Sequence, residues 1–160
     1  MNRALLAFAL LFSGLLAGID VDRAIVAMPS WQIVGPTGWA DFSRHADLGN
    51  GLFLYPAEAI VGALSALAAA IGFQFERDAP SSVKVLLYAS VVLAIGGLLL
   101  TLEAAPIMLG IREVADAAAL TRAFGEFRFW GNLRAICQVL AFIAQLAALA
   151  IWLRNEPQWE

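Results

Sequence analysis

The chain has few of the residues that hold metals and redox groups. Its 160 residues include one cysteine, Cys137, and one histidine, His45. A single cysteine excludes an intrachain disulfide and any multi-cysteine zinc or iron–sulfur site. A single histidine excludes a haem held by two histidines of one chain. The sequence therefore identifies no cofactor and no metal.

Charge is also scarce. Only 14% of the residues are charged, the net charge is −3, and 61% are hydrophobic. A soluble domain has about a quarter charged residues and about half apolar ones. The ten basic residues are scattered along the chain, so we find no basic patch for nucleic acid. This composition predicts a protein whose first partner is the lipid bilayer.

Four apolar runs account for this composition, at residues 4–28, 52–73, 83–109 and 133–153. A membrane-spanning helix needs about 20 apolar residues. We therefore predict an all-α fold with a single domain over residues 1–160, a bundle of four transmembrane helices. Arg3 followed by the apolar stretch and Leu16-Ala17-Gly18 also resembles a secretory signal peptide, but we favour a first span.

Four spans put both termini on one face, here called the terminal face. The two longer connections lie on the opposite face, here called the loop face. The first connection, residues 29–51, is predicted to be an ordered loop with turns at Gly35-Pro36 and Gly49-Asn50-Gly51. The second connection contains a helix over residues 111–127, which extends the third span or lies along the membrane surface.

Positive charge does not determine the orientation. Four basic residues fall on each face: Arg3, Arg77, Lys84 and Arg154 on the terminal face, and Arg44, Arg112, Arg122 and Arg128 on the loop face. The positive-inside rule therefore has no bias to act on, and only the early Arg3 favours cytoplasmic termini. We expect an integral membrane protein of the bacterial inner membrane.

Two polar stripes run along the predicted spans. The second span carries Glu58, Gly62, Ser65, Ala69 and Gly72, and the fourth carries Arg134, Gln138, Ala141 and Gln145. Such spacing puts each set on one helical face. An ionisable group inside a membrane is costly and marks a functional site whose partner should be sought. Because both spans begin at the loop face, we predict an ion pair between Glu58 and Arg134.

Other polar groups gather at the same end of the bundle: Asp20, Asp22, Arg23, His45, Asp47, Glu103, Trp130 and Asn132. His45 with the carboxylates could supply metal ligands, but the spacing matches no known motif. A general-base mechanism needs fewer groups. In it, Glu58 or His45 removes a proton while Arg134 and Asn132 stabilise the oxyanion. Trp130, Trp39, Tyr55, Glu103 and Gln138 would bind the substrate.

Simpler interpretations exist for these residues. Asp20, Asp22 and Arg23 could be interfacial charges at a helix end, and Glu58 could hold Arg134 with no chemistry. Pro106 could kink the third span or end it.

The segment FRFWGNLR from Phe127 to Arg134, with the small and apolar run after it, resembles a Trp-x-Asn-x-Arg signature of the anthrone-oxygenase-like family of small four-helix membrane proteins. Ala105-Pro106 resembles that family's proline position. The family pattern has Asn two residues later, where this chain has Met108. The resemblance covers residues 103–149.

This resemblance implies an enzyme that oxidises anthrone-like compounds with molecular oxygen and no known prosthetic group, and it implicates Trp130, Asn132 and Arg134. We therefore predict an integral membrane oxidoreductase or oxygenase that binds a lipophilic aromatic or quinone-like small molecule at the loop-face end. The alternative is a non-catalytic membrane subunit or ligand-binding module, working as a homo-oligomer or in a larger membrane complex. Proton transport is less favoured, because no chain of carboxylates crosses the spans.

Overall fold

The computed structural model describes residues 2–155, and every regular element in this part of the chain is a helix. Helix follows helix in four long segments, each long and apolar enough to cross a membrane: Asn2–Val34, Pro36–Gln74, Ser81–Glu113 and Ala117–Arg154. The predicted all-α bundle of four transmembrane helices is confirmed.

The first two segments are composite. The first consists of α1 (Asn2–Asp22), a π-helical turn (Arg23–Ala27) and α2 (Met28–Val34). The second consists of α3 (Pro36–His45), a π-helical turn (Ala46–Asn50) and α4 (Gly51–Gln74).

The last two segments are simpler. The third consists of α5 (Ser81–Gly110) and a 3₁₀ turn (Ile111–Glu113), and the fourth is the single helix α6 (Ala117–Arg154). Pro106 stays inside α5 and does not end it.

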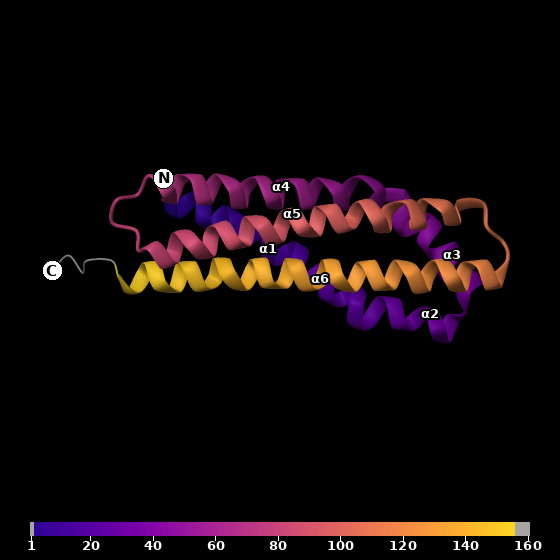
Figure 1. The fold of residues 1–160 in the computed structure, drawn as a ribbon. Helices are drawn as coiled ribbons and strands as arrows, with labels where there is room; N and C mark the ends of the chain where they lie inside the picture. Colours follow the sequence, from indigo (N-terminus) through magenta and orange to yellow (C-terminus); the bar gives the residue numbers. More distant parts are fainter. Residues whose placement is uncertain (1, 156–160) are drawn as a thin grey trace.

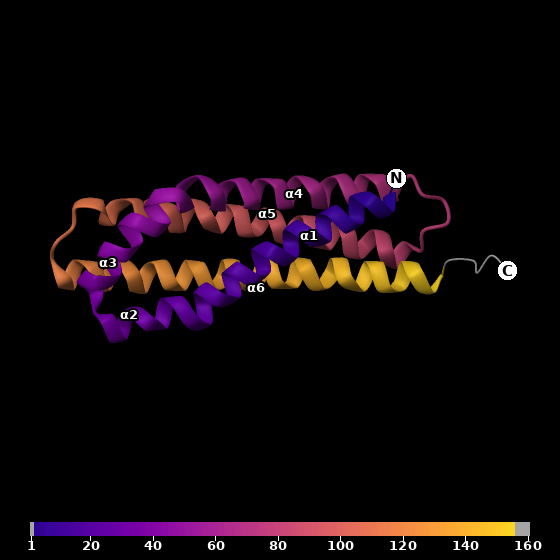
Figure 2. The same ribbon diagram turned by 180° about the vertical axis from the view of Figure 1, so that it is seen from behind.

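The four long helices form a closed ring. α1 packs against α4 and α6, and α5 packs against the same two helices. Figures 1 and 2 show the start of α1 and the end of α6 at one end of the bundle, with α2 and α3 at the other. The predicted terminal and loop faces are therefore correct.

The first connection is helical, so the prediction of a loop over residues 29–51 is wrong. The turn at Gly35 is correct, since its φ of 82° lies in the left-handed region, which favours glycine. At the second predicted turn the chain kinks at Gly49, whose φ of −89° and ψ of −117° are not helical. Pro36 then begins α3, where its missing N–H costs nothing. Indole packing explains the extra order, because the rings of Trp31 and Trp39 lie against Phe124 of α6.

Of the helix predicted over residues 111–127, residues 111–113 continue the third segment as a 3₁₀ turn, and residues 117–127 form the start of α6. The prediction that this helix extends the third span is therefore wrong beyond Glu113. The backbone becomes extended at Val114, and α6 begins at Ala117. Asp116 caps this start, because its side chain accepts a hydrogen bond from the N–H of Ala119 at 2.8 Å. α6 then continues past Gly125 and Gly131 without a break.

Two separate apolar cores hold the bundle together. The cap core, at the loop face, contains Met28, Trp31, Trp39, Ala40, Ala104, Met108, Ile111, Leu120, Phe124 and Phe127. The span core, toward the terminal face, contains Leu6, Ala66, Ala70, Phe73, Ala79, Val83, Leu87, Val91 and Ala148. The candidate site lies between them.

The outer surface of the spans is apolar, as a lipid-contacting surface must be. Large exposed side chains run along every long helix, among them Leu11, Leu64, Val92 and Ile143. Contact with a bilayer is therefore consistent with the structure.

Candidate functional site

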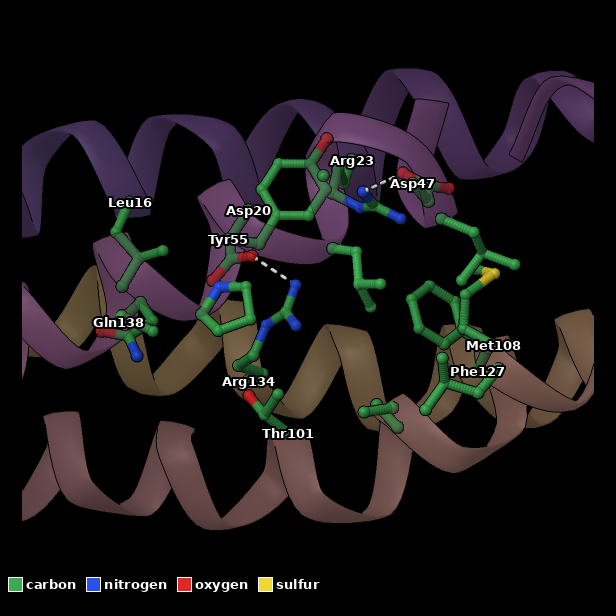
Figure 3. Close-up of a pocket in the computed structure, with 18 residues that line it drawn as sticks. Leu16, Asp20, Arg23, Asp47, Tyr55, Thr101, Met108, Phe127, Arg134 and Gln138 are labelled. Carbon is green, nitrogen blue, oxygen red and sulfur yellow. Dashed lines mark hydrogen bonds and ion pairs between the residues drawn. The ribbon is translucent and has the colours of Figure 1, made fainter. Parts of the chain in front are cut away.

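A cavity of about 120 Å³ lies between the two cores, at the loop-face ends of the spans. Figure 3 shows its wall, to which all four long segments contribute: Leu16 from the first, Tyr55 from the second, Thr101 and Met108 from the third, and Phe127 and Gln138 from the fourth. Most of the wall is carbon, and the polar groups are confined to a few positions. Ligand sites combine these two properties.

The central polar pair of the cavity joins α1 to α6. Nη2 of Arg134 donates to Oδ1 of Asp20 at 2.7 Å, and both side chains line the cavity. Asp20 is only 2% exposed. Its second oxygen, Oδ2, accepts no hydrogen bond from any residue in the described part of the chain.

Helical periodicity puts both groups there. The buried positions of α1 include Leu6, Ala9, Ser13, Leu16 and Asp20, spaced 3, 4, 3 and 4. Asp20 therefore continues the stripe that faces the other helices. Arg134 lies one turn before Gln138, on the inward face of α6.

A second ion pair closes the loop-face end of the cavity. Nη1 of Arg23 donates to Oδ1 of Asp47 at 2.6 Å, and the Arg23 guanidinium lies 5.1 Å from the ring centre of Tyr55 and 5.6 Å from that of Phe127. The side chains of both charged residues are largely buried. Arg23 thus ties the turn before α4 to α1 and α6 through one ion pair and two cation–π contacts.

The turn that carries Arg23 is wider than an α-helix. The N–H of Met28 donates to the carbonyl of Arg23, five residues back. Pro29 follows and has no N–H to donate to the carbonyl of Ile25, which weakens α-helical bonding here. Such π-helical turns are frequent at functional sites. Gly51, at the start of α4, makes room for the Tyr55 ring. A Cβ at this position would lie 2.6 Å from that ring.

Gln138 supplies a polar group on the side of the Asp20–Arg134 pair that is nearer the terminal face. It is 3% exposed and lines the cavity near Leu16 (Figure 3). Gly97 of α5 makes room for it, because a Cβ at that position would collide with the Gln138 amide. Gln145, two turns further along α6, accepts a hydrogen bond from Ser13 at 2.7 Å through Oε1, while its buried Nε2 has no partner among the described residues.

The predicted ion pair between Glu58 and Arg134 is wrong. Glu58 is at a suitable depth, since Tyr55 and Ala59 on either side of it line the cavity with Arg134. Its own side chain does not line the cavity, and its Oε2 is buried without a hydrogen-bond partner among residues 2–155. Arg134 instead pairs with the carboxylate of Asp20, which projects from the neighbouring helix α1.

The other predicted site residues divide into two groups. Arg134, Tyr55 and Gln138 line the cavity, and Asn132 lines a neighbouring space of about 10 Å³ together with Arg23, Arg128 and Arg134. That space is about the size of one water.

The second group lies away from the cavity. His45 is exposed, with Nδ1 2.8 Å from the carbonyl oxygen of its own-helix neighbour Asp41, so its predicted role as a base has no support from its position. Trp39 and Trp130 pack in or against the cap core, and Glu103 is exposed on α5. These residues do not reach the cavity wall.

No group of three or more His, Cys, Asp and Glu side chains in residues 2–155 is close enough together to hold a metal ion. The carboxylates that do face the cavity, Asp20 and Asp47, each have an arginine partner. The sequence marked Asp20, Arg23 and Asp47 as polar groups at this end without assigning them a role. Asp20 and Arg23 could have been recognised from the sequence, because they are opposite charges three residues apart in an apolar run.

Comparison with protein-family models, curated proteins and solved structures finds no match for this chain. Arg134 and Arg23 can donate to an oxygen with negative charge, Oδ2 of Asp20 can accept a proton or a hydrogen bond, and the Gln138 amide can do both.

Proposed function

We propose that this protein binds a lipophilic aromatic or quinone-like small molecule in the cavity and acts on it as a membrane oxidoreductase of the oxygenase type. One observation carries the proposal: a largely apolar cavity inside the spans has a buried Asp20–Arg134 pair in its wall, and one oxygen of the acid is unpaired. An unpaired buried carboxylate oxygen is costly, and a ligand hydroxyl would satisfy it.

The roles of the groups follow from this arrangement. Oδ2 of Asp20, in place of Glu58 or His45, accepts the proton of an acidic O–H or C–H group of the ligand. Arg134 then stabilises the negative charge that develops on the ligand oxygen. Asn132 and Arg128 line the neighbouring water-sized space beside Arg134.

The oxidant in this proposal is molecular oxygen, as the resemblance of residues 127–134 to the anthrone-oxygenase-like signature implies. A CH₂ group beside an aromatic ketone would become a C=O group, and the second oxygen atom would leave as water with both hydrogens. We place the protein in a bacterial inner membrane, because four apolar helices satisfy their own backbone hydrogen bonds and can span a bilayer.

The first experiment measures binding. Purified protein in detergent is titrated with 2-naphthol and with naphthalene, and isothermal titration calorimetry gives the affinities relative to protein-free micelles. We expect saturable binding of one molecule per chain, tighter for 2-naphthol. The double variant Asp20→Asn, Arg134→Gln should still bind naphthalene and should no longer bind 2-naphthol more tightly than naphthalene. Absence of saturable binding of either compound would refute the proposal.

The second experiment measures turnover. Anthrone serves as the probe substrate, and an oxygen electrode follows dioxygen consumption. Consumption that depends on Asp20 and Arg134 supports the oxygenase. Binding without any consumption would favour the alternative function, a non-catalytic ligand-binding module or subunit of a membrane complex.

A further inference from the structure

The size of the cavity limits what can enter it completely. Its volume is about 120 Å³. An apolar protein cavity of about 150 Å³ holds a single benzene molecule. One aromatic ring therefore fills this cavity, and a ligand with substituents or further rings must leave part of itself outside.

The wall between α4 and α5 leads to the bilayer. Pro56 of α4 and Leu109 of α5 line the cavity and are also exposed on the outer surface. About one turn further toward the terminal face, the same wall has the small side chains of Ala59 and Ala105, both half-buried. An apolar chain attached to the ring can pass between the two helices here and reach the lipid.

A second polar group, the Gln138 amide, is available at the inner end of the cavity to bind another oxygen of the ligand. The Gln138 amide is buried, lines the cavity, and makes no hydrogen bond to any residue in the described range 2–155. The amide faces the cavity, so its place suits a ligand group that both accepts and donates. Gln138 lies one turn from Arg134 on α6, which separates their Cβ atoms by about 5–6 Å. That spacing is of the order of the width of one ring.

We infer that the ligand is a single-ring quinol or quinone with an apolar tail, bound with one oxygen at the Asp20–Arg134 pair, the opposite oxygen at Gln138, and the tail between α4 and α5. This inference rests on the binding part of the proposed function and narrows the class of ligand that the cavity holds. Gln138 is then the residue that selects compounds with two opposite oxygens over those with one.

The test of the oxygens uses three probes with the same ring and different oxygen counts. They are 1,2,4,5-tetramethylbenzene, 2,3,5,6-tetramethylphenol and tetramethylhydroquinone, titrated calorimetrically under argon into protein in detergent. We expect the hydroquinone to bind about tenfold more tightly than the phenol, as one added hydrogen bond to a buried group allows. The near-isosteric Gln138→Met should bring the ratio of hydroquinone affinity to phenol affinity from about ten to about one. Leu140→Met, on the lipid side of the same helix, is the matched control and should change nothing.

The test of the tail uses a fourth probe, 2,3,5-trimethyl-6-decylhydroquinone. Ala105→Trp narrows the gap between α4 and α5 and should weaken this probe about tenfold more than it weakens tetramethylhydroquinone. Leu102→Trp, exposed to lipid on the same helix, serves as the control.

The outcomes separate this inference from the proposed function. Equal affinity of the wild-type protein for the phenol and the hydroquinone would overturn the role of Gln138, and this comparison needs no variant to fold. Equal weakening of the two hydroquinones by Ala105→Trp would overturn the route of the tail. In both cases the phenol would still bind. If none of the four probes binds saturably, the proposed function itself fails.

Discussion

Arg134 and Asp20 are 114 positions apart in the chain, and their side chains meet at 2.7 Å inside the bundle. The pair joins the end of α1 to the middle of α6 and forms the polar centre of the cavity. It takes the place of the pair between Glu58 and Arg134 that sequence spacing favoured. Four experiments follow from this arrangement and from the groups around it.

Removing only one member of the pair should destabilise the protein more than removing both. Asp20→Asn leaves the Arg134 charge without its partner and should lower the free energy of unfolding by about 3 kcal/mol. The double variant Asp20→Asn, Arg134→Gln removes both charges and should recover at least half of that loss. Urea unfolding in mixed micelles measures both values. A double variant as unstable as the sum of the two single variants would show that the side chains are not coupled.

The second ion pair should hold the turn before α4. Asp47→Asn weakens the attachment of residues 46–50 to Arg23, whose guanidinium keeps its contacts with Tyr55 and Phe127. We expect backbone amides of this turn to exchange with deuterium about tenfold faster, as local opening becomes easier. Amides in the middle of α5 serve as the internal control. Unchanged exchange in the turn would mean that packing alone holds it.

Two adjacent glycines of α5 should respond differently to alanine. Gly97→Ala forces the Gln138 side chain to move, whereas a Cβ at Gly96 would lie at an ordinary 3.9 Å from Sγ of Cys137. Alanine gains up to about 1 kcal/mol over glycine inside a helix. We therefore expect Gly96→Ala to raise the melting temperature, and Gly97→Ala to lower it and to weaken tetramethylhydroquinone binding several-fold. Equal effects at both positions would contradict the close approach of Gln138 to α5.

Glu58→Gln should leave ligand binding within twofold of the wild-type value, because the Glu58 side chain does not line the cavity. Naphthol titration measures this, and Asp20→Asn is the matched comparison, with an expected loss of about tenfold. A larger effect of Glu58→Gln than of Asp20→Asn would return the acidic role to Glu58.

Sequence alone determined the membrane class, the four spans, the placement of both termini on one face and the end of the bundle that collects polar groups. These properties are local or additive, because apolar length and the periodicity of each helix can be counted along the chain. The inward positions of Arg134 and Gln138 were visible in the same way. The stripe of α1 that ends at Asp20 was equally present, with its 3, 4, 3, 4 spacing.

Only the tertiary structure decided which acid meets Arg134, that the first long connection is helical, and that the helix after Val114 continues into the fourth span. Asp20 and Glu58 lie at comparable depth on α1 and α4, which pack against each other. The periodicity of each helix therefore cannot show which of the two acids pairs with Arg134. The choice depends on the order of the helices around the bundle, because α1 packs against α6 whereas α4 packs against α1 and α5. The helical state of residues 36–45 likewise depends on a distant aromatic ring, that of Phe124, against which Trp39 is buried.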